Sequence, residues 1–407
     1  MRRVTTIALV ALSLSAPPAA TAQLVAKDVS APSGLFQVSH TYSSTVADFN
    51  DDGWPDVLLV RHFGSFPALY LNQEGTFVDV SATAFPTNPD RRDFHSCPAA
   101  DVNQDGRLDF YCTIGGGKGG TKPNPKQLWL QQPGGTFVQR AAEWHVTDPY
   151  GRGREATFID ANGDRYPDLF VGNTFPRVDG HRSPNRLFIN EGGADFRDAP
   201  EYGLDRQVGA DFTAQAIDFD LDGWQDLLVC GKTGLLLYRN VDGEGFENLS
   251  LNGESRGSCR FAALAQMNRD PRPDLVRLTH RAVTIRLQRH GAFRGGAAYR
   301  RELYGGRQLG LGDVNGDGLD DVYVLRTGHY IKRFNANVNG DHPDRMLVNH
   351  GSGHRFRNML IPQTRRGIGD AVAPIDYDRN GLTDFIVMNG FMKAEGPTRL
   401  IAFHEGS

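Results

Sequence analysis

The residues best suited to chemistry in this chain are oxygen-bearing side chains that recur at fixed spacing in short acidic segments. The first segment reads Asp48-Phe-Asn50-Asp-Asp52-Gly53-Trp-Pro-Asp56, with side-chain oxygens at its positions 1, 3, 5 and 9. Three carboxylates and an amide this close together suit Ca²⁺, which takes six to eight oxygens at about 2.3–2.6 Å. The glycine at position 6 allows a sharp turn with positive φ, and the carbonyl of Trp54 is the natural backbone ligand. The segment therefore predicts a calcium-binding loop.

The acidic segment occurs seven times. The copies begin at residues 48, 101, 160, 218, 266, 313 and 376, so the period runs from 47 to 63 residues. Periods of this length indicate propellers or solenoids. Six copies keep all four side-chain oxygens. With position 7 counted for its carbonyl, their expected ligands are Asp48, Asn50, Asp52, Trp54, Asp56, Asp101, Asn103, Asp105, Arg107, Asp109, Asp160, Asn162, Asp164, Tyr166, Asp168, Asp218, Asp220, Asp222, Trp224, Asp226, Asp313, Asn315, Asp317, Leu319, Asp321, Asp376, Asp378, Asn380, Leu382 and Asp384.

Two copies depart from the pattern at position 6. The third copy has Arg165 where glycine is usual, and a residue other than glycine seldom takes a positive φ. It keeps all four oxygens, however, so we extend the expectation of calcium to it. The fifth copy has Gln266 at position 1 and Pro271 at position 6, where proline cannot reach a positive φ. We expect the fifth loop to be empty, which leaves five to six Ca²⁺ per chain.

The residues around these loops exclude an EF-hand, which needs a glutamate at position 12 and flanking helices. Position 12 in the six better copies is Leu59, Cys112, Val171, Val229, Val324 and Val387. Short apolar, partly β-branched runs follow position 9 and are typical of buried strands. Each loop should therefore join two strands. Ordinary acidic turns are the alternative interpretation, and the sevenfold recurrence disfavours it.

The second half of each repeat contains two further strands around a glycine-rich turn, as in Ala68–Asn72 and Thr76–Ser81. Each repeat thus has strands A and B on either side of the acidic loop, then C and D. Seven such repeats predict an all-β, seven-bladed β-propeller with four-stranded blades and calcium-binding loops between strands A and B. The seventh repeat lacks a strand D, which residues 24–30 should supply by pairing with 398–404.

The loops, together with strands such as 185–190 (Asn-Arg-Leu-Phe-Ile-Asn), resemble the FG-GAP or VCBS-type repeats of integrin α-subunit propellers, and bacterial exported propellers in particular. The resemblance covers residues 23–407. It implies calcium-binding blades, and the family includes adhesion modules, lectins and some polysaccharide-degrading enzymes. The chain has no Arg-Gly-Asp sequence.

The N-terminus predicts export. Residues 1–22 combine Arg2 and Arg3, an apolar run and small residues before Gln23, as signal peptides do. No later apolar run is long enough to span a bilayer. We therefore expect a secreted or periplasmic protein, in which disulfides are stable. Cys97 and Cys112 should lie on paired strands of the second repeat, whereas Cys230 and Cys259 either bridge neighbouring blades or remain buried thiols.

The face opposite the acidic loops carries the candidate ligand site. Long B–C loops at 62–67, 115–126, 174–184, 327–344 and 390–397 should surround the channel mouth, and arginines precede several A strands. An anionic ligand would suit such a surface. Ion pairing of these arginines with neighbouring acids is the alternative. The candidate ligand-binding residues are Arg92, Arg154, Arg366, Arg177, His181 and Tyr330.

The sequence contains no recognisable catalytic motif, and no catalytic residue is assigned. His62, His95, His145, His181, His329 and His342 could act as bases or metal ligands, but none has a partner at diagnostic spacing. The first hypothesis is a non-catalytic binding or adhesion module for an extracellular glycan or protein surface, acting as a monomer without nucleic acid or membrane insertion. The second is a polysaccharide-active enzyme, with paired carboxylates expected for a glycosidase and a His/Tyr/Arg cluster for a lyase.

Overall fold

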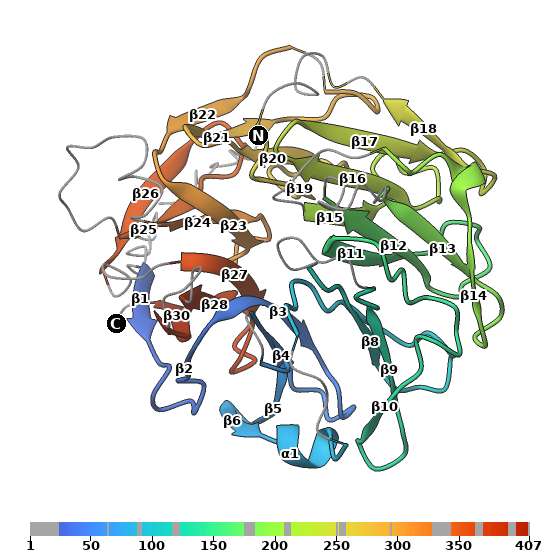
Figure 1. The fold of residues 1–407 in the computed structure, drawn as a ribbon. Helices are drawn as coiled ribbons and strands as arrows, with labels where there is room; N and C mark the ends of the chain where they lie inside the picture. Colours follow the sequence, from blue (N-terminus) through green and yellow to red (C-terminus); the bar gives the residue numbers. More distant parts are fainter. Residues whose placement is uncertain are drawn as a thin grey trace, which may run out of the picture.

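The protein is described by a computed structural model that covers residues 24–62, 65–87, 92–115, 123–174, 184–206, 213–249, 251, 258–293, 295–327, 343–362, 369–389 and 396–405. Within these residues, seven four-stranded antiparallel sheets surround a central axis (Figure 1). This confirms the expected all-β fold, a seven-bladed propeller with four-stranded blades. The expected signal peptide, residues 1–22, lies outside the described residues.

The first four blades follow one another along the chain. Blade 1 comprises β3 (Thr41–Ala47), β4 (Asp56–Arg61), β5 (Ala68–Gln73) and β6 (Thr76–Asp79). Blade 2 comprises β7 (Ala99–Ala100), β8 (Asp109–Cys112), β9 (Gln127–Gln131) and β10 (Phe137–Gln139). Blade 3 comprises β11 (Gly153–Ile159), β12 (Asp168–Asn173), β13 (Arg186–Asn190) and β14 (Phe196–Asp198). Blade 4 comprises β15 (Thr213–Ile217), β16 (Asp226–Gly231), β17 (Gly234–Asn240) and β18 (Phe246–Leu249).

The remaining blades bring the two ends of the chain together. Blade 5 comprises β19 (Phe261–Ala265), β20 (Asp274–Leu278), β21 (Ala282–Arg286) and β22 (Tyr299–Glu302). Blade 6 comprises β23 (Gly306–Gly312), β24 (Asp321–Arg326), β25 (Asp344–Asn349) and β26 (Phe356–Ile361). Blade 7 comprises β27 (Gly369–Ile375), β28 (Asp384–Asn389), β30 (Arg399–Glu405) and β1 (Leu24–Asp28). Shorter elements are α1 (Ser81–Ala84), the 3₁₀ turn η1 (Pro200–Tyr202) and a two-stranded sheet of β2 (Val38–Ser39) and β29 (Gly396–Pro397).

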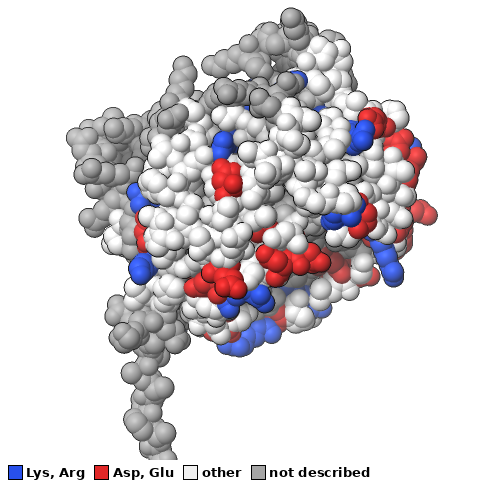
Figure 2. Space-filling view, turned by 90° about the horizontal axis from the view of Figure 1, so that it is seen from below, with Lys and Arg blue, Asp and Glu red and all other residues white. Residues whose placement is uncertain are grey.

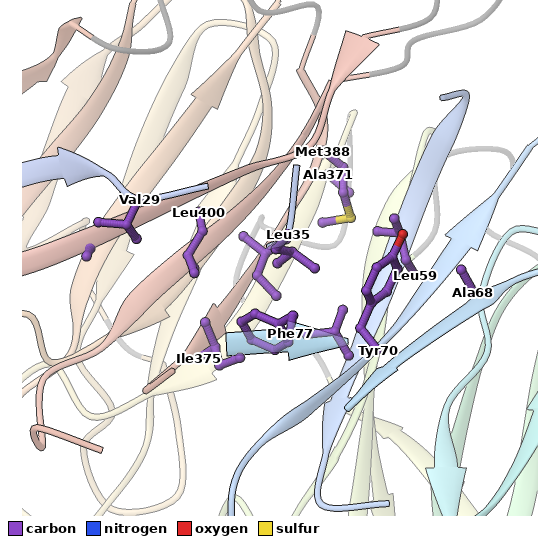
Figure 3. Packing of buried hydrophobic residues seen from close by; sticks show 13 residues of the cluster. Val29, Leu35, Leu59, Ala68, Tyr70, Phe77, Ala371, Ile375, Met388 and Leu400 are labelled. Atoms are coloured by element: carbon purple, nitrogen blue, oxygen red, sulfur yellow. The ribbon is translucent and has the colours of Figure 1, made fainter. Parts of the chain in front are cut away.

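The N-terminal strand completes the last blade. Strand β1 pairs antiparallel with β30, from Leu24 opposite Glu405 to Asp28 opposite Ile401. The segment that follows β1 then packs Val29 and Leu35 into the apolar core between blades 7 and 1 (Figure 3). Residues from the two ends of the chain thus share one sheet and one core. Because β1 pairs with β30, β30 is not left as an unpaired edge strand.

Strand B of each blade is apolar because it is buried on both faces. In β4, for example, all four residues from Val57 to Val60 have no exposed surface. Neighbouring blades pack these faces together in seven apolar clusters arranged around the ring. Burial on both faces explains why the strands after the acidic loops read as continuous apolar runs rather than as alternating ones.

Amides at or just beyond the ends of the C strands connect each blade to the one before it. In six blades, an asparagine or glutamine side chain donates a hydrogen bond of 2.8–2.9 Å to the carbonyl at position 2 of the preceding blade's acidic loop. The pairs are Asn72–Tyr377, Gln131–Phe49, Asn190–Val102, Asn240–Ala161, Gln288–Phe219 and Asn349–Met267. We call these bonds the inter-blade latches. They place the acidic loops at blade junctions.

Both expected disulfides are present. Cys97–Cys112 joins the segment before β7 to the end of β8 within blade 2. Cys230–Cys259 joins β16 of blade 4 to the segment before β19 of blade 5, which resolves the open alternative in favour of a bridge between blades. No helix among the described residues is long and apolar enough to cross a membrane.

Candidate functional site

The acidic loops share one geometry, in which the position-1 carboxylate organises the backbone. Asp48 accepts hydrogen bonds from the backbone N–H groups of Asp52 and Gly53, at 3.1 and 2.7 Å, and four of the other complete loops have equivalent bonds from positions 5 and 6. In loop 3 the donors are at positions 4 and 6. Gly53 has a φ of 84°, as the sequence pattern requires. The loops are therefore tight turns whose carboxylates converge on their interior.

Several carboxylate oxygens in these loops are close enough together to hold one cation. In loop 4, ligand atoms of Asp218, Asp220 and Asp222 lie within 4.8 Å of one another, and in loop 7 the same holds for Asp376, Asp378 and Asp384. Oδ1 of Asp220 and Oδ1 of Asp378 are buried without a hydrogen-bond partner. A buried carboxylate oxygen without a donor is costly unless a cation satisfies it. The residues present therefore fit a hard cation with oxygen ligands.

The two divergent loops differ from each other. In loop 3, Arg165 adopts a φ of 72° and takes the place of the usual glycine, so the loop keeps its turn and its donor set. In loop 5, the Gln266 side-chain amide donates hydrogen bonds to the carbonyls of Asn268 and Asp270. A neutral amide thus contacts oxygens that a cation would otherwise attract.

The aspartate at position 9 has a structural role that the sequence interpretation missed. Asp56 is fully buried and accepts backbone N–H groups from Phe49 at 2.8 Å and from Asn72 at 2.8 Å. It thereby fastens the loop to strand C of its own blade. Asp274 of the divergent loop 5 also accepts a strand C backbone N–H, from Gln288 at 2.7 Å. The available signal was that loop 5 keeps this aspartate although it lacks the aspartate at position 1 and the glycine at position 6.

Burial sets the protonation behaviour of these aspartates. Desolvation, and then the neighbouring loop carboxylates, raise the pKa of Asp56 to about 6 and that of Asp384 to about 8, although backbone N–H donors oppose the shift. The same causes raise the pKa of Asp109, Asp168, Asp226 and Asp321 to about 7. A bound cation would stabilise the ionised forms and oppose this rise.

A hollow that is open to solvent lies at the other end of the A strands. All seven blades contribute to it, because each A strand, or the short segment that leads into it, lies next to the axis. Its lining includes, in blade order, Tyr42, His95, Glu155, Thr213, Arg260, Arg307 and Asp370. Burial raises the pKa of Glu155 to about 7, although a hydrogen bond from the Ser96 hydroxyl opposes this rise. We call this hollow the channel mouth.

Polar side chains on the A strands tie neighbouring blades together around the axis. Gln215 donates to the Leu264 carbonyl at 3.1 Å and accepts from the Leu264 N–H at 2.7 Å. Ser43 donates to the His95 carbonyl at 2.7 Å, and Gln308 accepts from the Val372 N–H at 3.0 Å. These bonds give the channel mouth a polar wall of fixed geometry.

The expected basic ligand site is described only in part. Arg177, His181, Tyr330 and Arg366 lie outside the described residues. Arg92 donates to Asn124 Oδ1 at 2.7 Å, and Arg154 contacts both ring nitrogens of His95 at 2.9 Å. Arg307 forms a buried ion pair with Asp370 at 3.0 Å, as the alternative interpretation anticipated for the arginines. In a view of the rim, Asp and Glu side chains form a band across the lower half, and others lie in the upper half and along its right side, with Lys and Arg side chains beside them (Figure 2).

A compact group of polar rings lies beside the channel mouth and was not recognised from the sequence. Tyr42 stacks on His62 with ring centroids 5.0 Å apart and meets His95 edge-on at 4.6 Å. Asp93 lies 2.8 Å from His62, and Arg154 reaches the group from blade 3. His62 and His95 were candidates, but their 33-residue separation gave no sign that they meet.

Comparisons with known proteins agree with the fold. Residues 48–112, which span the first two acidic loops, match the FG-GAP-like repeat family. An Agrocybe aegerita lectin that recognises non-reducing terminal N-acetylglucosamine has a TM-score of 0.51 at 16% identity, with 79% of this chain and 80% of the lectin covered. BBS1N, solved in complex with ARL6DN, has a TM-score of 0.51 at 12% identity, with 90% of this chain and 93% of the BBS1N chain covered. No protein of curated function matches. These findings are consistent with an FG-GAP propeller of the integrin α type.

Proposed function

We propose that this FG-GAP-like propeller is an exported binding module whose channel mouth holds an extracellular glycan, and whose acidic loops hold calcium. The observation that carries the proposal is the convergence of polar side chains from all seven blades on one hollow. Sites for small ligands are typically concave, largely preformed and lined by a few convergent polar groups. The fixed bonds between neighbouring A strands supply the preformed geometry.

The chemistry of the channel mouth suits sugar hydroxyls and carboxylates. Tyr42 offers an aromatic ring, and Arg260 a guanidinium of the kind that can bind a carboxylate with two hydrogen bonds. Glu155 has a pKa raised to about 7, so its carboxyl can donate as well as accept near neutrality. The structural likeness to a lectin that recognises terminal N-acetylglucosamine supports a glycan ligand, although at 16% identity it establishes only the fold.

Calcium has a stabilising role in this proposal and does not touch the ligand. The acidic loops follow the C-terminal ends of the A strands, whereas the channel mouth lies at their N-terminal ends. Ions that bind only the folded chain stabilise it by mass action. Residues 1–22 and the two disulfides support export to an oxidising compartment, where free calcium is available.

The test is a glycan array probed with the mature chain, followed by affinity measurements on the best ligand in calcium-containing buffer. Replacing Arg260 with alanine should weaken binding by roughly tenfold or more, as the loss of a central charged contact does. Arg300→Ala is the matched control, because Arg300 pairs with Glu302 on an exposed part of β22. No ligand on the array, or equal affinity in both variants, would contradict glycan binding at the channel mouth.

A lyase acting on acidic polysaccharides is the second candidate, favoured by the cluster of Tyr42, His62, His95 and Arg154. Burial, and then Arg154 and His62, hold the pKa of His95 well below its usual range, so the ring is neutral near pH 7. Incubation with uronate polymers would separate the candidates. A lyase generates unsaturated ends that absorb ultraviolet light, whereas a binding module retains the polymer unchanged.

A further inference from the structure

Three potential metal-ligand atoms meet beside the channel mouth. Nε2 of His62 lies 2.9 Å from Nε2 of His95 and 2.8 Å from Oδ1 of Asp93, and the third distance, from His95 Nε2 to Asp93 Oδ1, is 3.8 Å. Ligands about 2.0–2.2 Å from a tetrahedral Zn²⁺ stand about 3.3–3.6 Å from one another. Shifts of about half an ångström would therefore bring all three atoms to coordinating distance.

The hydrogen bonds of His95 direct its Nε2 lone pair into this group. Nδ1 of His95 lies 3.0 Å from the Gly153 carbonyl, which can only accept, and 2.9 Å from Nη1 of Arg154, which can only donate. We assign the proton to Nδ1, because the buried carbonyl then receives a hydrogen bond from the ring. Nε2 is then the unprotonated nitrogen. A second ring N–H bound to a backbone carbonyl is the usual way in which proteins orient a metal-binding histidine. The ring is nearly fully buried, with 2% of its side chain exposed.

The three side chains are held on a rigid frame. The backbone of His95 is fixed by bonds from its N–H to Thr113 at 3.2 Å and from Ser43 to its carbonyl at 2.7 Å. The Cys97–Cys112 disulfide fastens the same segment two residues further along the chain. Oδ1 of Asp93 is buried yet accepts no hydrogen bond of good geometry, although it lies next to His62. The frame therefore leaves a carboxylate oxygen available to a cation.

We propose that His62, Asp93 and His95 form a transition-metal site of the Zn²⁺ type at the channel mouth, distinct from the calcium loops. Two imidazole nitrogens and one carboxylate oxygen match the ligands of open zinc sites and disfavour Ca²⁺, which prefers oxygen alone. The Asp93 side chain is 29% exposed, so solvent reaches this group from the Asp93 side. A fourth ligand would be water or an anionic group.

Arg154 is a positive charge beside the site and opposes the metal, and Arg152 adds a weaker opposing charge. Its Nη1 lies 2.9 Å from both ring nitrogens of His95, so its positive charge lies within a few ångströms of the ion's position. Replacing Arg154 with the neutral, polar glutamine should therefore strengthen zinc binding by roughly three- to tenfold, because the partly screened repulsion between the guanidinium and the ion is removed. A purely structural hydrogen-bond cluster would show no such gain.

The experiment uses the mature chain saturated with Ca²⁺, so that the acidic loops are occupied, and titrates it with Zn²⁺ by calorimetry. We expect one zinc ion per chain. His62→Ala should weaken zinc binding by roughly a hundredfold, because a ligand is lost. Co²⁺ added to the wild-type chain should give the visible absorption of a four-coordinate nitrogen and oxygen site, and His62→Ala should abolish it.

His145→Ala is the matched control. His145 also lies 2.8 Å from a carboxylate, that of Asp195, but its side chain is 71% exposed, and it belongs to no group of three possible metal ligands among the described residues. Its loss should leave zinc affinity unchanged. If His62→Ala fails to fold by circular dichroism, Asp93→Asn replaces it in the comparison. Less than one zinc ion per chain, or wild-type affinity in the ligand variant, overturns the proposal.

Discussion

Two aspartates in the same acidic loop should have different roles in stability. Asp56 at position 9 is fully buried and accepts two backbone N–H groups at 2.8 Å, whereas Asp52 at position 5 is exposed. Asp56→Ala leaves two buried donors unsatisfied, at about 1–3 kcal/mol each, so the free energy of unfolding should fall by about 2–6 kcal/mol. Asp52→Ala should cost no more than about 1 kcal/mol without calcium, because water replaces its hydrogen bonds.

Urea denaturation of both variants and the wild-type chain, with calcium and with chelator, separates the two roles. With calcium at a hundredfold excess over its dissociation constant, Asp52→Ala should lose about 2.7 kcal/mol more than in chelator, because one bound ion is lost. The penalty of Asp56→Ala should persist in chelator. Equal stability of the two variants in chelator would refute a structural role for position 9 that is independent of the ion.

Three further expectations concern pH, cross-links and closure. Glu155 has a pKa of about 7 in the folded chain against 4.5 in the unfolded chain, so the folded state binds its proton more tightly. The free energy of unfolding should therefore fall as the pH rises from about 4.5 to about 7. Glu155→Gln should remove about 1–3 kcal/mol of that fall, measured by urea denaturation, after allowance for the partial exposure of Glu155. Replacing Cys230 and Cys259 together by serine opens a loop of 29 residues and should cost about 3–4 kcal/mol, measured by denaturation against the wild-type chain. Deleting residues 24–30 exposes the edge of β30 and should lower the melting temperature markedly, and an unchanged melting curve would contradict closure by β1.

The fold was predictable because its signals are local and repeated. Each acidic loop marks the junction of strands A and B, and each glycine-rich turn marks that of C and D, so counting strands gives seven blades without any knowledge of long-range contacts. The strands on or near which the cysteines lie were identified correctly for the same reason, because each cysteine can be counted from the nearest acidic loop.

The features that depend on contacts between blades were not predictable. Asn72 and Asn190 look like ordinary residues before a turn, yet their amides latch onto the preceding blade. His62 and Asp93 come from different blades, and their approach to 2.8 Å depends on how far one sheet is rotated against the next. No spacing along the chain encodes that rotation, so the cluster beside the channel mouth became visible only in three dimensions.

The pairing of β1 with β30 fixes the order in which the molecule can mature. Residues 24–28 are synthesised long before their partners at 401–405, so blade 7 cannot be completed until the chain has been made as far as residue 405. Until then, Val29 and Leu35 lack the blade 7 side of their core. A circular permutant that joins residue 405 to residue 24 and opens the chain between blades 3 and 4 would make this closure a local hairpin. It should fold faster than the natural order, because contacts near in sequence form sooner.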